Sequence, residues 1–247
     1  MLKPRKISTF FLLIAYLVVL FGCFCTPISA RVHSETLAKN NTQTPYTESI
    51  STAKKGFWNL SDVDITKVNP NRKLIALTFD DSPDKTLEKI IAVFLGHNSA
   101  HPDAPATATI FCNGCRIHSP VDTVLHTAVT AGFELGNHTQ NHKKLTTLCP
   151  AELQQEIDKT DKRLSRYDGK IRHLFRPPYG ELNPESRPLI PTPIISWYID
   201  TLDWTGISAE QIYETVWKNK FSGAIVLMHD GYENTVTALK RLLPDLY

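Results

Sequence analysis

The chain has 247 residues, of which 42% are hydrophobic and 21% charged, a composition ordinary for soluble globular proteins and sufficient for one sizeable core. Its formal net charge is +2, and the first 30 residues supply this excess because they contain three basic residues and no acidic one. The rest of the chain carries 24 basic against 25 acidic residues. Binding to a phosphate backbone needs a basic excess, so we expect no nucleic-acid partner.

The start of the chain has the pattern of an export signal. Basic residues end at Lys6, an apolar run covers about residues 10–24, and small residues lead to Ala30. We expect residues 1–30 to be a signal peptide or, because the apolar run is nearly long enough to span a bilayer, a membrane anchor. Residues 31–55 are polar without apolar periodicity and predict a linker, which leaves residues 56–247 as one folded domain of the size of a catalytic domain.

Short apolar runs alternate with helical patterns from Leu74 onwards. The run 74–79 predicts a buried strand, and 86–96 repeats apolar residues at helical spacing. Further strands are expected at 108–112, 133–135, 173–175, 194–199 and 224–228, and further helices at 123–131, 150–167 and 208–219. Strands that alternate with helices imply parallel βαβ units, and the period favours a distorted (β/α) barrel of about seven parallel strands over an open sheet.

Three cysteines lie beyond the export signal, namely Cys112, Cys115 and Cys149. In an oxidising compartment they leave room for one disulfide and one free thiol. The C-x-x-C spacing of the first two is a weak metal signal, because a zinc ribbon needs a second pair and the chain has none.

Two carboxylates, Asp80 and Asp81, follow the first predicted strand. Adjacent side chains of a regular strand point to opposite faces, so these two converge on one site only where the strand turns. Pro83 supplies a reason for such a turn. An acidic pair at a strand end is more often a solvated loop, so this pair alone does not identify a catalytic site.

Two histidines, His138 and His142, follow the strand expected at 133–135. Their i, i+4 spacing would place both rings on one face of a helical turn, where they can share a cation. Two surface histidines can have this spacing by accident. Together with a carboxylate from elsewhere, however, they form a two-His, one-Asp set that binds a divalent metal and leaves positions open for water and substrate.

Three further polar clusters also follow predicted strands, and their sequences are Arg-Pro-Pro-Tyr-Gly at 176–180, Asp-Thr-Leu-Asp-Trp at 200–204 and Leu-Met-His-Asp-Gly at 227–231. Taken singly, the first two clusters can be a rigid turn and an acidic loop. The histidine of the third cluster stands at the end of a strand, where a buried histidine with satisfied hydrogen bonds is the more common outcome. Barrel enzymes place catalytic groups after the strands because all the strand C-termini open onto one face. Their common placement therefore predicts a single active site.

In order and form, the five clusters resemble those of the polysaccharide deacetylase family, which includes chitin, peptidoglycan and xylan deacetylases. The resemblance runs from about Lys73 to Leu242. It implies that Asp80 is the general base and that Asp81, His138 and His142 bind a divalent metal. The resemblance also implies that His229 is the catalytic acid, that Asp203 tunes this acid and that Arg176 pairs with the base. The remaining three residues would contact the substrate: the backbone N–H of Tyr179 would bind the oxyanion, Trp204 would form a wall of the pocket, and Leu227 would contact the acetyl methyl group.

The expected function is therefore metal-dependent removal of N-acetyl groups from amino-sugar units of a peptidoglycan or chitin-like polysaccharide. Zinc suits two histidines and a carboxylate, although cobalt, nickel or manganese would also fit. Two alternatives remain open: an esterase acting on O-acetylated polysaccharides such as xylan, and a catalytically silent glycan-binding protein. The export signal places the protein outside the cytoplasm, where it would be secreted, periplasmic, associated with the cell wall or anchored to the membrane.

Two further features bear on the fold and the host. Members of the family that the chain resembles usually continue through a longer helix into a final strand, whereas this sequence ends at Tyr247. We therefore expect either a barrel that lacks its last strand and is open at that edge, or a truncated form of the protein. Asn137-His138-Thr139 is a glycosylation sequon within the metal motif. A glycan there would obstruct the site, and this favours a bacterial host.

Overall fold

The structure, a computed structural model, describes residues 73–118 and 122–247. The expected signal segment 1–30, the linker 31–55 and the beginning of the catalytic domain at residue 56 lie outside the described residues. Within the described part, no helix is both long and apolar enough to cross a membrane.

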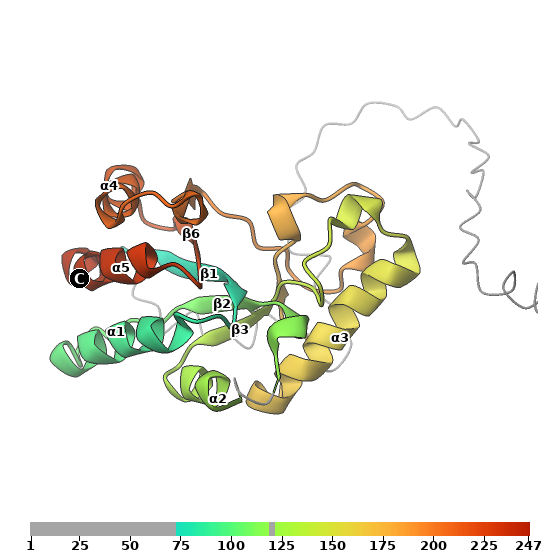
Figure 1. Cartoon of the computed structure of the whole chain (residues 1–247), viewed down its shortest axis with the longest axis horizontal. Helices are drawn as coiled ribbons and strands as arrows, with labels where there is room; N and C mark the ends of the chain where they lie inside the picture. The colour runs from blue at the N-terminus through green and yellow to red at the C-terminus, as the bar shows by residue number, and fades with distance from the viewer. Residues whose placement is uncertain (1–72, 119–121) are drawn as a thin grey trace, which may run out of the picture. The chain divides into compact units, whose positions relative to one another are not determined.

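A six-stranded sheet forms the centre of the described part (Figure 1). Its strands are β1 (Ala76–Ser82), β2 (Thr109–Cys112), β3 (Glu134–Asn137), β4 (Leu174–Phe175), β5 (Ile199–Asp200) and β6 (Ile225–His229). The spatial order is β4-β3-β2-β1-β6-β5, and all neighbouring strands are parallel. The predicted α/β class with parallel strands is thus confirmed.

The six strands of the described part form an open sheet and not a closed barrel, and each corresponds to one of the six strand ranges expected from the sequence. Between β4 and β5, the strand expected at 194–199 is present only in part: Ile194 makes one bridge to Phe175, and the two-residue β5 begins at Ile199. This connection contains the prolines at 177, 178, 184, 188, 191 and 193. Proline lacks the N–H that a strand ladder needs, so this part of the chain folds as turns and short 3₁₀ helices.

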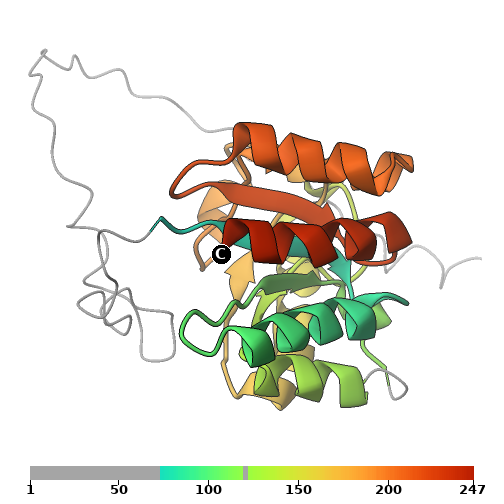
Figure 2. The same ribbon diagram turned by 90° about the vertical axis from the view of Figure 1, so that its left-hand side faces the viewer.

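Five α-helices accompany the strands, namely α1 (Leu87–Ala100), α2 (Asp122–Thr130), α3 (Pro150–Asp168), α4 (Ala209–Asn219) and α5 (Glu233–Leu246). The first four agree with the predicted helices, with bounds that differ by a few residues. The sequence prediction missed α5, although Val236, Leu239 and Leu243 are buried at helical spacing. Figure 2 shows α4, α5, α1 and α2 side by side as one layer over the strands.

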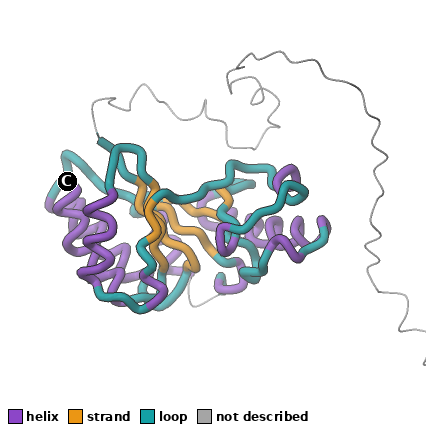
Figure 3. The backbone as a smooth tube through the Cα atoms, turned by 90° about the horizontal axis from the view of Figure 1, so that it is seen from above, coloured by secondary structure: helices purple, strands orange, loops and turns teal. Residues whose placement is uncertain are grey.

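The main core lies between this helix layer and the sheet. Leu77 and Phe79 of β1 are buried there, and the rings of Phe79 and Phe94 meet edge to face with centroids 6.3 Å apart. Because side chains alternate along a strand, Thr78 and Asp80 point away from these helices. In Figure 3 the strands lie between the helix layer and a second region of loops, short helices and α3. The functional side chains of β1 therefore face this second region.

The three cysteines of the described part are free thiols, so the disulfide suggested by the sequence does not form. Cys112 belongs to β2 and is fully buried in the core, whereas Cys115 is exposed on the following turn. Burial raises the pKa of the Cys112 thiol, with smaller contributions from nearby carboxylates. This keeps Cys112 protonated and unreactive.

Candidate active site

The two carboxylates of β1 converge through a bulge inside the strand. The register of β1 against β2 shifts between Phe79 and Ser82, and Asp81 has a φ of 63°. An extra residue of this kind breaks the alternation of side chains, so Asp80 and Asp81 both line one cavity. The sequence analysis placed the change of direction at Pro83, whereas the strand bends before it.

His138 and His142 lie on a loop, and the expected helical turn is absent. The loop begins directly after β3 and turns through positive φ angles of 70° at Thr139 and 53° at His142. The Thr139 hydroxyl accepts a hydrogen bond from the His142 N–H at 3.0 Å. The rings of the two histidines nevertheless meet, with centroids 5.0 Å apart, because the loop folds back on itself.

Asp81, His138 and His142 form a group that could hold a metal ion. One ligand atom from each lies within 4.8 Å of the others, and Asp81 Oδ1 is 3.6 Å from His142 Nε2. This buried Asp81 oxygen has no hydrogen-bond partner among the described residues. A buried carboxylate oxygen without a partner is costly, and a divalent cation would satisfy it. The donor set therefore fits a divalent metal ion.

The hydrogen bond of His138 and the lowered pKa of His142 both suit metal binding. His138 Nδ1 lies 2.7 Å from the carbonyl oxygen of Arg176, which can only accept, so Nδ1 carries the proton and Nε2 is left free toward Asp81. Burial and then the neighbouring His138 lower the pKa of His142. Since a metal binds the neutral imidazole, this lowered pKa favours ligation near neutral pH.

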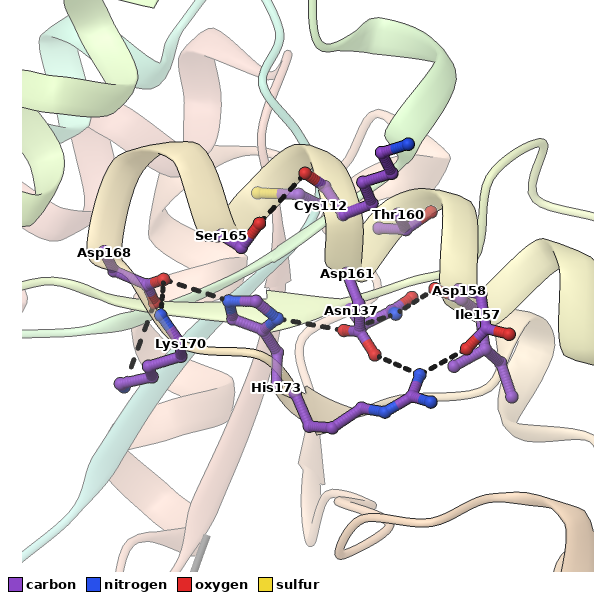
Figure 4. A network of polar contacts seen from close by, with 12 residues as sticks. Cys112, Asn137, Ile157, Asp158, Thr160, Asp161, Ser165, Asp168, Lys170 and His173 are labelled. Carbon is purple, nitrogen blue, oxygen red and sulfur yellow. Dashed lines mark hydrogen bonds and ion pairs between the residues drawn. The ribbon is translucent and has the colours of Figure 1, made fainter. Parts of the chain in front are cut away.

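A buried polar network holds the histidine loop from behind (Figure 4). Asp161 Oδ1 lies 2.9 Å from both Asn137 Nδ2 and His173 Nδ1. The Asn137 side-chain oxygen in turn accepts a hydrogen bond from the Thr139 N–H at 2.9 Å. A continuous path of hydrogen bonds thus connects α3 to the loop that carries both histidines.

His173 lies between two carboxylates of α3. Besides its contact with Asp161, His173 Nε2 is 3.2 Å from Asp168 Oδ1. Burial by itself lowers the pKa of His173, but the hydrogen bonds and charges of the two carboxylates raise it overall. The buried Asp161 also accepts a hydrogen bond from Arg172 at 3.1 Å. The buried Asp161 carboxylate is therefore paired with both His173 and Arg172.

Arg176 is fully buried and orients Asp80. Its Nη1 donates to Asp80 Oδ1 at 2.7 Å and to the Thr78 hydroxyl at 2.8 Å. Its Nε donates to the Ile195 carbonyl, and its guanidinium lies 4.1 Å from the centre of the Phe111 ring. Asp80 is therefore a buried, paired carboxylate with one oxygen directed by Arg176.

On the other side of the cavity, Asp203 holds His229. Asp203 Oδ1 is 2.7 Å from His229 Nδ1, and Asp203 Oδ2 accepts from the His229 backbone N–H and the Thr235 hydroxyl, both at 2.7 Å. Burial lowers the pKa of His229, but the hydrogen bond and charge of Asp203 outweigh it and raise the pKa overall. In the sheet register His229 is the partner of Asp80, so the two groups stand on neighbouring strands.

The structure brings all ten predicted site residues together around one cavity of about 420 Å³. Eight of them line it, namely Asp80, Asp81, His138, His142, Tyr179, Trp204, Leu227 and His229. Arg176 and Asp203 lie behind this lining with no exposed surface. Tyr179 and Trp204 are 62% and 52% exposed, so they form the rim of the cavity.

Two residues that line this cavity, Trp197 and Tyr232, were missed from the sequence, and a third, Asp200, was named there only as part of the 200–204 cluster, without a role. Asp200 and Tyr232 each stand within three residues of a predicted site residue, and this proximity was the available signal. Trp197 gave no such signal, because it lay inside the strand expected at 194–199. A Cβ on Gly180 would come within 2.7 Å of the Trp197 ring, which explains the glycine there.

The fold and the site define an α/β protein in which a candidate metal site shares one cavity with Asp80, held by Arg176, and His229, held by Asp203. The polysaccharide deacetylase family model matches residues 67–190. A peptidoglycan-N-acetylglucosamine deacetylase of Bacillus cereus is 35% identical over 188 residues, covering 73% of this chain and 84% of the relative. The chain belongs to the polysaccharide deacetylase family.

Other relatives are longer than this chain. The peptidoglycan-N-acetylmuramic acid deacetylase PdaC of Bacillus subtilis is 31% identical over 179 residues, which cover 72% of this chain but only 37% of PdaC. A second Bacillus cereus peptidoglycan-N-acetylglucosamine deacetylase is 33% identical, with 71% of this chain and 64% of the relative covered. A solved structure of PdaC is similar to this chain with a TM-score of 0.65 and 31% identity, covering 72% of this chain and 85% of that one.

Proposed function

We propose that this protein is a metal-dependent hydrolase that removes N-acetyl groups from amino-sugar units of a cell-wall polysaccharide, with peptidoglycan as the first candidate. The observation that carries the proposal is that the Asp81–His138–His142 group lines the same cavity as Asp80 and His229. Amide hydrolysis needs a base on one side of the carbonyl and an acid for the departing amine on the other. The names of the relatives favour peptidoglycan over chitin.

Asp80 is the proposed general base. A divalent ion held by Asp81, His138 and His142 would polarise the acetyl carbonyl and lower the pKa of a coordinated water. Arg176 fixes Asp80 through a hydrogen bond of 2.7 Å and balances its charge. The remaining oxygen of Asp80 is then free to accept the proton that the attacking water loses.

His229 is the proposed general acid. An amine leaves an amide only after it has been protonated, and the raised pKa of His229 keeps a proton available for this step near neutral pH. Asp203 binds Nδ1, so Nε2 is the nitrogen that carries the transferable proton toward the cavity. Once it has lost this proton, the neutral imidazole keeps its orientation because Asp203 still accepts from Nδ1.

The remaining residues would bind the substrate. Leu227 is an apolar residue lining the cavity and suits contact with the acetyl methyl group, while the exposed rings of Tyr179 and Trp204 suit stacking against sugar faces. The backbone N–H of Tyr179 is the proposed donor to the oxyanion of the tetrahedral intermediate. These assignments follow the roles of matching positions in the family.

The metal and the cellular location belong to the same proposal. Zinc is the first candidate for a site of two imidazoles and one carboxylate, with cobalt, nickel and manganese as competitors. We infer export from a bacterial cell because the sequence of residues 1–30 has the pattern of a signal peptide or membrane anchor and because the relatives act on bacterial cell walls by name.

Acetate release from purified full-length protein tests this function. Three substrates separate the alternatives: peptidoglycan, N-acetylglucosamine oligomers and O-acetylated xylan. The proposal predicts release from peptidoglycan that disappears in the Asp80→Asn variant. Release from xylan alone would favour the esterase, an alternative that a bifunctional xylanase/deacetylase of Pseudobutyrivibrio xylanivorans, 31% identical over 179 residues, keeps relevant. Binding of glycan by a folded, metal-loaded protein without acetate release would favour the silent glycan-binding protein.

A further inference from the structure

Helix α3 separates its charges between two faces. Three of its acidic side chains have partners outside the helix. Glu156 accepts from the Asn141 N–H at 2.7 Å, Asp158 pairs with Arg172, and Asp161 accepts from Asn137. These acidic residues are engaged in holding the histidine loop and the strand behind it. They are therefore not paired with the basic residues of their own helix.

The basic residues of α3 line a second cavity, of about 780 Å³, which lies outside the proposed active site. The four cations there are Lys159, Lys162, Arg163 and Arg166. Among the described residues, none of the four lies within ion-pair distance of a carboxylate, and no acidic residue lines the cavity. This is a concentration of positive charge on a chain that is close to neutral beyond its first 30 residues.

The spacing of these cations places them on one face. Residues 159, 162, 163 and 166 follow the i, i+3, i+4, i+7 pattern, so they form a stripe about 10 Å long at 1.5 Å per residue. The negative end of the helix dipole favours a cation in the last turn, where Arg166 lies. Because this effect falls off within one turn, it does not account for Lys159 or Lys162.

The second cavity lies next to the proposed active site. Gln140 lines it, and Gln140 is two residues from both His138 and His142. Two residues span at most about 7 Å of chain, so Gln140 brings one edge of the second cavity close to the two histidines. A polymer that places one unit in the active-site cavity would direct a neighbouring unit across this loop toward the four cations.

We propose that this second cavity is an anion subsite that binds carboxylate groups of the polysaccharide substrate. The inference rests on the proposed function and narrows its substrate to an acidic N-acetylated glycan. Peptidoglycan carries carboxylates on its peptide side chains, whereas chitin carries none. The subsite would thus help the protein to select an acidic wall glycan over a neutral one of similar backbone.

A matched pair of glycans tests the subsite: soluble peptidoglycan fragments with free carboxylates, and the same fragments with those carboxylates amidated. The variant Lys159→Gln/Lys162→Gln/Arg166→Gln removes three exposed cations and keeps Arg163, which donates to the Ile117 carbonyl. We expect KM for the carboxylate form to rise about five- to tenfold in this variant, with kcat and the amidated substrate unchanged within about twofold.

The control variant Lys85→Gln/Arg187→Gln/Lys240→Gln removes the same charge from exposed cations outside this cavity. An equal rise of KM in this control, or equal KM values of wild-type protein for the two glycan forms at low salt, would overturn the subsite. A phosphodiester polymer that competes for the cavity while amidation has no effect would likewise overturn the carboxylate assignment.

Direct binding separates this inference from the proposed function. The dissociation constants of both glycan forms are measured for wild-type and triple-variant protein by calorimetry, without need of turnover. Absence of acetate release from either form would contradict the proposed function, while a carboxylate-dependent affinity lost in the triple variant would still support the subsite. Equal affinities for the two forms would refute it even if both are deacetylated.

Discussion

His229 Nδ1 lies 2.7 Å from Asp203 Oδ1, and the second oxygen of Asp203 is held by the Thr235 hydroxyl and the His229 backbone N–H. Both oxygens of this buried carboxylate thus have donors, and Asp203 is fixed in one orientation. The imidazole is fixed with it, so its free nitrogen faces the cavity that contains Asp80 and Asp81. This relationship suits His229 to its proposed role as proton donor, because Asp203 fixes the direction of its free nitrogen.

The first prediction concerns the acid itself. Replacement His229→Ala should lower kcat about 10²- to 10⁴-fold, the usual contribution of a positioned acid or base. The amount of metal bound per chain should be unchanged, because His229 does not belong to the group of Asp81, His138 and His142. Acetate release and bound metal are measured on the same sample. Retention of full turnover would remove His229 from the mechanism.

The second prediction concerns the pH profile. As the proposed acid, His229 acts only when it is protonated, so kcat/KM should fall as the pH rises through its pKa. This fall is the alkaline limb of the pH profile, and the raised pKa of His229 moves the limb to higher pH. In Asp203→Asn, burial still lowers the pKa of His229, but the carboxylate that raises it is gone. The alkaline limb should therefore move to lower pH in this variant. An unchanged limb would mean that another group supplies the proton.

The third prediction concerns the buried pair of Arg176 and Asp80. Arg176→Met leaves the carboxylate buried without its partner and should lower the free energy of unfolding by about 3–5 kcal/mol. The double variant Arg176→Met/Asp80→Asn also removes the charge, so it should recover part of this loss. Urea denaturation of both variants measures the difference. Equal destabilisation would show that Arg176 acts through packing on Phe111 instead.

The fourth prediction concerns the network behind the histidine loop. Asp161→Asn weakens the contacts that orient Asn137 and thereby the loop, so zinc affinity should fall about 10- to 100-fold, as for other residues that hold metal ligands. Asp158→Asn is the control, because Asp158 pairs with Arg172 and has no contact with Asn137. Zinc titration of the apo-proteins should separate the two. Equal zinc affinity in both variants would contradict a positioning role for Asp161.

The same network predicts a pH dependence of stability. The pKa of His173 is higher in the folded protein than in the unfolded chain. Its contribution to the free energy of unfolding is therefore complete below the pKa that His173 has in the unfolded chain, and it is lost as the pH rises through the pKa of the folded protein. The free energy of unfolding should therefore decline from about pH 6.5 upward, starting at the ordinary histidine pKa. His173→Gln should show a smaller decline over this range, and an identical slope would refute the assignment.

The sequence predicted the positions of the strands and the proximity of the functional side chains because parallel strands open at one edge. It could not predict how those side chains converge. Adjacent carboxylates in a strand require a local break of the alternation, and the break at Asp81 depends on a positive φ that no aspartate signals by itself. The histidine pair likewise has helical spacing, yet it is joined by a loop held through Asn137 and Thr139.

The sequence led us to expect an open edge where the last strand is missing, whereas the described sheet is open between β4 and β5. Counting apolar runs assigned a strand to 194–199, although prolines at 191 and 193 remove the donors needed to extend the ladder there. Cys112, by contrast, shows a limit of motif arguments. Its C-x-x-C spacing with Cys115 is compatible with a disulfide bond or a metal site. Its position in β2, however, directs the thiol into the core.

Zinc titration coupled to acetate release from peptidoglycan tests the central claim most directly, with chelated wild-type protein and chelated Asp80→Asn compared side by side. We predict that both bind one zinc ion per chain with similar affinity, because Asp80 is not in the group of Asp81, His138 and His142, and that zinc restores release in the wild type alone. Equal release by Asp80→Asn, or zinc binding to wild-type protein without any release, would contradict the account.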